Sequence, residues 1–133
     1  MEAQKKGQVI SRIYIGFSIL SLAYVSLLSL YSPQMTMDLV QTTLPNTDAM
    51  SSIRGIYGGV GMVIVATLVY LFMKDVRKGV QFLAVFWFAY LFSRLLTMWI
   101  DGPLGDFGKQ WLVIESVMCL IAVTITYSLP KTE

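Results

Sequence analysis

The sequence predicts an all-α membrane protein, a four-helix bundle whose helices run alternately up and down. Apolar residues make up 56% of the 133-residue chain and charged residues only 14%, whereas soluble domains are about a quarter charged. The apolar residues fall in four segments, each near the roughly 20 residues that a membrane span needs. Because a spanning backbone must satisfy its own hydrogen bonds, we expect helices, in a single domain over residues 1–133.

The four expected spans follow one another along the whole chain. They cover residues 9–31, 52–73, 79–100 and 110–129. The first resembles a secretory signal, but its apolar run of about 19 residues is too long and no small-residue cleavage site follows, so we expect a retained span. The third contains Arg94, and cutting it there would leave only about 15 apolar residues, too few to cross.

The long connection over residues 32–51 leaves two alternatives open. Residues 35–40 could form a short helix on the membrane surface, since Pro33 suits a first helical turn. An irregular loop fits equally well. The following Pro45-Asn46-Thr47-Asp48 is a turn signal that would lead into the second span.

Charges in the connections orient the spans. Basic residues gather on one side, at Lys5, Lys6, Arg12, Lys74, Arg77, Lys78 and Lys131. The other side carries mainly acidic residues, at Asp38, Asp48, Asp101 and Asp106. Because lysine and arginine in short flanks stay inside, we expect both termini in the cytoplasm. Three aromatic residues near the opposite face fit an interfacial belt, at Tyr31, Trp99 and Trp111.

Two charges lie inside the last two spans. Arg94 is six residues before Ile100 and Glu115 five after Gln110, so both lie roughly 8–9 Å below the outer face. Consecutive spans with a short connection are antiparallel neighbours. Because a charge in lipid needs a partner, we predict that Arg94 and Glu115 form an ion pair. The pair is either a structural clamp or part of a ligand site.

Polar and small residues near the second span extend this prediction. Arg54 either snorkels into the headgroups or turns inward, where it would help to receive an anionic headgroup or a carboxylate. Gly55 and Gly59 have a GxxxG spacing, and Gly58 and Gly61 widen the face of small residues. This pattern predicts helix packing within the bundle, with a homodimer face as the alternative.

The first and last spans hold further polar groups at depth. Four of them share one face of the first span and are expected to serve helix packing, with a polar cavity wall as the alternative: Ser11, Tyr14, Ser18 and Ser21. Cys119 lies in the middle of the fourth span, where we expect it to act as a small apolar filler.

Composition excludes several function classes. There is no histidine and only one cysteine, so an internal disulfide and a CxxC redox pair are ruled out, and we expect neither a metal nor a cofactor. A net charge of +2 is too small for a nucleic-acid footprint. We do not expect an enzyme, because only Glu115, Asp101 and Tyr57 remain for acid–base chemistry.

The motif pattern resembles a bacterial membrane-protein family described only as a domain of unknown function, whose members are short four-helix proteins. The matching residues are Arg54-Gly55-Ile56-Tyr57-Gly58-Gly59, Arg94, Asp101-Gly102-Pro103 and Glu115. Gly55 stands where the family often has alanine. The layout is more distantly similar to DoxX-type membrane proteins. The resemblance implies a multi-pass protein of the bacterial cytoplasmic membrane with a shared polar site, formed by Arg54, Tyr57, Arg94, Asp101 and Glu115.

Two functions fit these observations. The first is a binding or accessory protein whose outward-facing polar pocket receives a lipid, a small anionic ligand or a partner helix. The alternative is a small transporter or transporter subunit, proton-coupled through Glu115, because intramembrane carboxylates mark proton relays. Against it, the inner half of the bundle offers no ionisable residue to continue a path. A homo-oligomer or a partner membrane protein fits either function.

Overall fold

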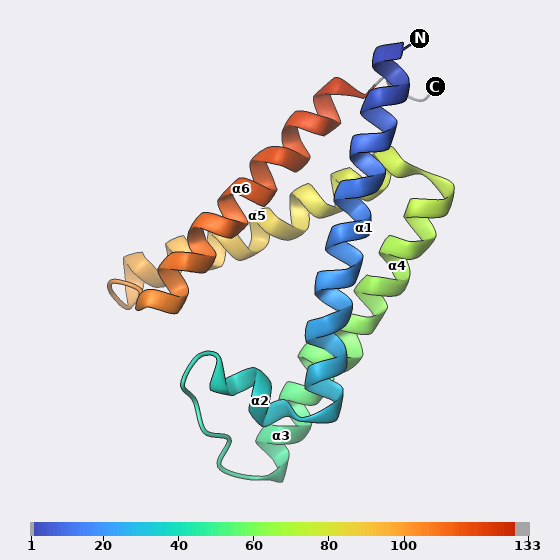
Figure 1. Cartoon of the computed structure of the whole chain (residues 1–133). Coiled ribbons are helices and arrows are strands. Elements are labelled where there is room, and N and C mark those ends of the chain that lie inside the picture. The colour runs from blue at the N-terminus through green and yellow to red at the C-terminus, as the bar shows by residue number, and fades with distance from the viewer. Residues whose placement is uncertain (1, 130–133) are drawn as a thin grey trace. The chain divides into compact units, whose positions relative to one another are not determined.

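The computed structural model describes residues 2–129, so Lys131 lies outside the described residues. Over this range the chain is helical, without a strand, and has four helices long and apolar enough to cross a membrane (Figure 1). The predicted all-α class and the four spans are confirmed, and the chain is a multi-pass membrane protein. The helices are α1 (Glu2–Tyr31), α3 (Thr47–Ile53) continuing into η1 (Arg54–Val60) and α4 (Gly61–Lys74), α5 (Val76–Ile100), and α6 (Asp106–Ser128).

The connection after α1 contains the short helix α2 (Pro33–Asp38), with Pro33 in its first turn. Of the two alternatives for this stretch, the helix is correct, although it begins two residues before the expected start. The Gln34 side chain fixes the chain that follows: its amide nitrogen donates to Thr42 O over 3.0 Å, and its oxygen accepts from Leu44 N over 2.9 Å. Asn46 Oδ1 then caps α3 by accepting from Ala49 N over 2.8 Å.

The helices pack as two units, one of residues 16–74 and one of residues 2–15 with 75–129. In the first unit, the second half of α1 runs antiparallel to the helix of α3, η1 and α4. Ser29 Oγ donates to Ile53 O over 3.3 Å, and the backbone of Gly61 lies against the Ser26 side chain. Small residues on both helices therefore allow a close approach.

Two of the four glycines expected on the packing face make this contact. A Cβ added at Gly58 would lie 2.7 Å from Leu30 Cδ2, and one at Gly61 would collide with Ser26 Oγ. Around Gly55 and Gly59, in contrast, no described atom lies within 4 Å of such a Cβ. The packing prediction is correct for Gly58 and Gly61 and wrong for Gly55 and Gly59, whose GxxxG face is open in the described chain.

A π-helix explains the difference. Arg54–Val60 forms η1, in place of the uniform α-helix expected for the second span. Its i→i+5 turns advance the chain by a different angle per residue, so a face read with a 3.6-residue period does not carry through the segment. Gly55, Gly58 and Gly59 all lie within η1, and glycine weakens the competing α-helix by about 1 kcal/mol per residue.

The second unit joins α5, α6 and the first half of α1. Three contacts show that α5 and α6 are antiparallel along their whole length (Figure 1). Arg77 Nη1 donates to Leu129 O over 2.7 Å at one end, Cys119 Sγ lies 3.7 Å from Ala84 O in the middle, and Arg94 meets Glu115 towards the other end. On α1, Tyr14 Oη donates to Met118 O over 2.7 Å and so attaches α1 to α6.

The connection between α4 and α5 has structural tasks besides its charge. Asp75 Oδ1 accepts from Lys78 N over 3.0 Å and caps α5, and this backbone N–H holds the pKa of the Asp75 carboxyl below its usual value. The Arg77 guanidinium lies at the carboxyl end of α6, where the helix dipole favours a cation. The basic residues counted for topology thus also fix helix ends.

Polarity is inverted relative to a soluble protein. On α1 the buried residues include Ser11, Ser18, Ser26 and Ser29. The exposed residues on the same helix are large and apolar, among them Ile13, Phe17, Leu20, Tyr24 and Leu27. Contiguous apolar surface of this extent is rare on soluble monomers, and small polar residues are common where membrane helices meet. The helix therefore turns its packing face inward and offers an apolar face to lipid.

The Ser26–Gly61 contact predicts a difference between two identical substitutions. Gly61→Ala places a methyl group against the Ser26 side chain, and we expect unfolding in detergent to become easier by about 1–3 kcal/mol through overpacking. Gly59→Ala is the matched control, because the same methyl group meets open space and should leave stability equal or slightly raised. Equal melting of both variants in a thermal unfolding series would contradict this packing.

Candidate functional site

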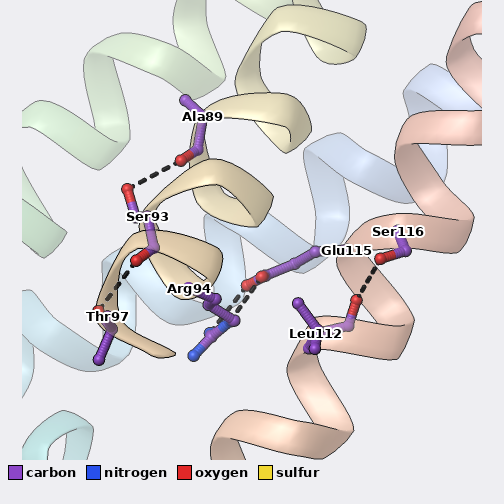
Figure 2. Close-up of polar contacts among 7 residues, drawn as sticks. All are labelled: Ala89, Ser93, Arg94, Thr97, Leu112, Glu115 and Ser116. Atoms are coloured by element: carbon purple, nitrogen blue, oxygen red, sulfur yellow. Dashed lines mark hydrogen bonds and ion pairs between the residues drawn. The ribbon is translucent and has the colours of Figure 1, made fainter. Parts of the chain in front are cut away.

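The predicted ion pair between α5 and α6 is present (Figure 2). Arg94 Nε donates to Glu115 Oε2 over 2.6 Å, and Arg94 Nη2 donates to Glu115 Oε1 over 2.8 Å. Two parallel charge-assisted hydrogen bonds are the strongest arrangement that these groups form. Both carboxylate oxygens are therefore engaged by one guanidinium.

The loop between the two helices sets this register. Helix α5 ends at Ile100 and α6 begins at Asp106, so the chain reverses within a few residues. Gly102 has a φ of 107°, a left-handed conformation that only glycine adopts without strain. Leu104 lies against Gly108, where an added Cβ would approach Leu104 Cβ to 3.0 Å. The tight reversal brings two residues of similar depth to adjacent positions.

The two partners differ in exposure. The Glu115 side chain is 2% exposed, whereas the Arg94 side chain is 20% exposed. A buried carboxylate in an apolar surrounding is stable only when paired, and Arg94 supplies that pairing. The arginine is thus the accessible member and the glutamate the hidden one.

The geometry leaves part of the guanidinium available. Arg94 has five N–H groups, and two of them bind Glu115 from the Nε side. The other three, on Nη1 and Nη2, have no acceptor among the residues that the structure describes. Figure 2 shows the far end of the guanidinium pointing away from α6. This end is a planar fork that matches a carboxylate or a phosphate.

Nearby hydroxyl groups bond to their own helices. Ser93 Oγ donates to Ala89 O over 2.8 Å, and Thr97 Oγ1 donates to Ser93 O over 2.9 Å (Figure 2). On α6, Ser116 Oγ donates to a backbone carbonyl over 2.6 Å. Because these hydroxyl protons are used within the helices, the donor capacity left at this level belongs to Arg94.

Of the five residues predicted to share a polar site, Arg94 and Glu115 are in contact. Asp101 caps the end of α5 and is exposed, and no ion pair or hydrogen bond joins it to Arg94 in the described chain. Seven residues separate the two along α5, which is about 10 Å of helix and too far for direct contact. Its membership of a polar site with Arg94 stays a prediction.

Arg54 and Tyr57 belong to the unit of residues 16–74. There Arg54 Nε donates to Leu30 O over 3.0 Å, at the carboxyl end of α1, where cations complement the helix dipole. This capping role differs from both alternatives weighed for Arg54. Tyr57 lies half-buried in η1. Their membership of a shared site with Arg94 stays a prediction.

Sequence reasoning missed the contacts that Tyr14 and Trp87 make. The spacing along α1 places Tyr14 with the serines, but its hydroxyl donates to the backbone of α6. Trp87 is buried on α5 and carried no signal apart from an aromatic-rich stretch. Cys119, expected as an apolar filler, is buried and also points its sulfur at Ala84 O. In residues 2–129 no group of three histidine, cysteine or carboxylate side chains could hold a metal ion.

Single and double substitutions separate the two charges' contributions to stability. Arg94→Met or Glu115→Met alone leaves an unpaired buried charge, and each should lower the free energy of unfolding by about 3–5 kcal/mol. The double variant removes both charges and should recover most of that loss in a detergent melt. Thr97→Ala, one turn away and exposed, is the control. A double variant as unstable as the sum of the singles would contradict a mutually dependent pair.

Comparison with known proteins extends over most of the chain. A family model described as "Domain of unknown function (DUF4345)" matches residues 10–126, which include Arg94 and Glu115. No curated protein and no solved structure matches, so the likeness to DoxX-type proteins stays a comparison of sequence layout. The match confirms the resemblance to a family of unknown function, and the chain belongs to the DUF4345 family.

Proposed function

We propose that the protein is a membrane-embedded binding or accessory protein in which Arg94 receives an acidic group. The observation that supports this function is the side-on ion pair. Glu115 engages Nε and one hydrogen of Nη2, which leaves the Nη1–Nη2 fork of a partly exposed arginine for a second anion. Lysine could not serve in the same way, because its ammonium lacks a second planar pair of donors.

Glu115 has a positioning role in this function. Its bidentate contact fixes the plane of the guanidinium, so the free fork is pre-organised and loses little entropy when a ligand binds. The pair also neutralises Arg94 while no ligand is present, which lowers the cost of keeping the charge inside a span. A bound acid would then share the arginine with Glu115.

Depth selects the kind of acid. Arg94 lies six residues before the end of α5, about 9 Å along the helix, near the boundary between headgroups and acyl chains. Apart from Ser93 and Thr97, whose hydroxyls bond to their own helix, large apolar side chains are exposed around it on α5 and α6, among them Leu95, Met98, Val113 and Ile114. An amphiphile with a carboxylate or phosphate head and an apolar tail matches both features. A lipid with an anionic headgroup and a fatty acid share this chemistry.

We also propose that both termini lie in the cytoplasm, so that Arg94 opens to the opposite side of a bacterial cytoplasmic membrane. The basic residues at the start of α1 and between α4 and α5 support this orientation, because short basic flanks stay inside. Mainly acidic residues occupy the other connections.

Reporter fusions test the orientation. A fluorescent protein fused after Glu133 should fold and fluoresce, and alkaline phosphatase at the same place should be inactive, because only the outer side supports its disulfides. The matched control is insertion of each reporter between Thr42 and Thr43, where the activities should be reversed. Active phosphatase after Glu133 would overturn the proposed topology.

Ligand-dependent stabilisation tests the binding function. The native protein in detergent should melt at a higher temperature with phosphatidylglycerol or an acyl carboxylate than with phosphatidylcholine, because binding to the folded state stabilises it. The Arg94→Met/Glu115→Met double variant should be folded but show no preference for the anionic lipid. Arg94→Lys should weaken the shift, since the planar fork is lost.

Comparison arms identify the source of the acidic group. Inorganic phosphate and short-chain acids test whether the head alone suffices, and native mass spectrometry reads any lipid retained. A native protein that shows the same melting temperature with anionic and zwitterionic amphiphiles would rule out the proposed function. So would a double variant that keeps the full shift.

A further inference from the structure

A row of aromatic rings on α5 leads to Arg94. Phe82, Phe86 and Tyr90 are four residues apart, and Arg94 is the next step of the same spacing, so the four side chains form one ridge along the helix. The rings of Phe82 and Phe86 stack with centroids 6.5 Å apart, and those of Phe86 and Tyr90 are 5.1 Å apart. This aromatic row is therefore a continuous apolar surface that ends at the arginine with the open fork.

The aromatic row is accessible and held in place. Tyr90 is 39% exposed, and Phe82 and Phe86 are half-buried. The buried Trp87 supports the row, because its ring meets Phe86 nearly edge-on at 5.1 Å and lies 6.4 Å from Tyr90. Rings that are already held by neighbours lose little freedom when a ligand packs on them. The row is thus a preformed surface.

The aromatic row has about the length of one acyl chain. From Arg94 back to Phe82, α5 extends about 18 Å. One leaflet contributes about 15 Å to the hydrocarbon core of a membrane. A tail whose acidic head binds Arg94 therefore reaches past Phe86 towards Phe82.

The row favours an acid that is joined directly to its tail. Phe82 and Phe86 have no polar side-chain atom and Tyr90 has one hydroxyl, so the apolar surface begins about 6 Å along the helix from Arg94. A phospholipid has glycerol and two ester groups between its phosphate and its tails, and these polar groups would face the rings. A fatty acid has no polar atoms besides the two carboxylate oxygens that an arginine fork binds.

We propose that the acidic amphiphile at Arg94 is a long-chain fatty acid whose tail lies along Phe82, Phe86 and Tyr90. This inference rests on the proposed function, because the carboxylate needs the Arg94 fork. Lipid surrounds the protein, so the tail gains from packing on rigid rings and not from leaving water. The charge fixes the head, and the row distinguishes a single chain from a two-chain lipid.

A second aromatic pair on α5 supplies a matched control. Phe88 and Phe92 stack with ring centroids 6.3 Å apart, and both are exposed. The next step of four residues is Leu96, so this pair leads to an apolar residue and not to a charge. Phe88→Leu therefore removes a ring from the same helix at a similar depth, away from the row that ends at Arg94.

The fluorescence of Trp87 reports a tail on the row. In a Trp99→Phe/Trp111→Phe background Trp87 is the one tryptophan left, and bromine atoms on an acyl chain quench tryptophan only at close range. Protein in phosphatidylcholine vesicles, at mildly alkaline pH, receives dibromostearate, or phosphatidylcholine or phosphatidylglycerol with the same brominated tail, at equal bromine content. Each measurement is normalised to the unbrominated compound. We expect the strongest quenching with dibromostearate.

Substitutions test whether the row and the fork hold the tail together. Phe86→Leu should weaken the apparent affinity for dibromostearate about fivefold, because leucine makes fewer contacts with a tail than a ring does. Phe88→Leu should leave the affinity unchanged. Arg94→Met/Glu115→Met should lose the excess quenching over brominated phosphatidylcholine. Phe82→Leu repeats the test at the far end of the row, which keeps it valid when Phe86→Leu does not fold.

Three results would overturn the fatty-acid proposal. They are equal quenching by dibromostearate and brominated phosphatidylcholine, stronger quenching by brominated phosphatidylglycerol, and an equal effect of the row variants and Phe88→Leu on affinity. Each leaves the binding function of Arg94 standing as long as the native protein melts at a higher temperature with anionic than with zwitterionic amphiphiles. Loss of that melting difference refutes the function itself, so the two failures are distinguishable.

Discussion

The ion pair between Arg94 and Glu115 constrains the rest of its unit, because neither charge is tolerable in the membrane alone. Moving a charge out of water costs several kcal/mol, and the attraction between two charges compensates only when their geometry is good. The 2.6 and 2.8 Å contacts fix the register of α5 and α6 at this level, which the short reversal between the two helices allows. The Gly102 turn and the Arg77 contact at the opposite end maintain that same register.

Elsewhere the helices associate through small residues and hydrogen bonds. Lipid is as apolar as the side chains that face it, so burial of leucine or valine gives little driving force for helix association. The chain accordingly buries serine, glycine and tyrosine where helices meet, as at Ser26 with Gly61 and at Tyr14 with Met118. Polar contacts determine which helices pair, and the apolar exterior favours insertion into the membrane.

Hydropathy and charge were sufficient to predict the spans and the ion pair. Length decided the number of helices, and equal depth on consecutive spans brought Arg94 to Glu115. Features that depend on the rotation from one residue to the next about the helix axis were less predictable. The π-helix η1 changes the face that glycines present, so of the four glycines expected on one face, Gly58 and Gly61 make the contact, whereas Gly55 and Gly59 have no described neighbour. Trp87 and Tyr14 come from distant helices, and no periodicity within one segment relates them.

A clamp and a binding site are compatible in one arginine, because the two faces of a guanidinium are chemically separate. The Nε face holds Glu115 and fixes the helices, while the Nη1–Nη2 face carries donors that the described chain leaves unused. A purely structural pair would satisfy more of those donors, since unsatisfied donors next to lipid are costly. An arginine 20% exposed beside a glutamate 2% exposed is instead arranged with its hidden side occupied and its open side available. That asymmetry is the physical basis of the binding function that we propose for Arg94.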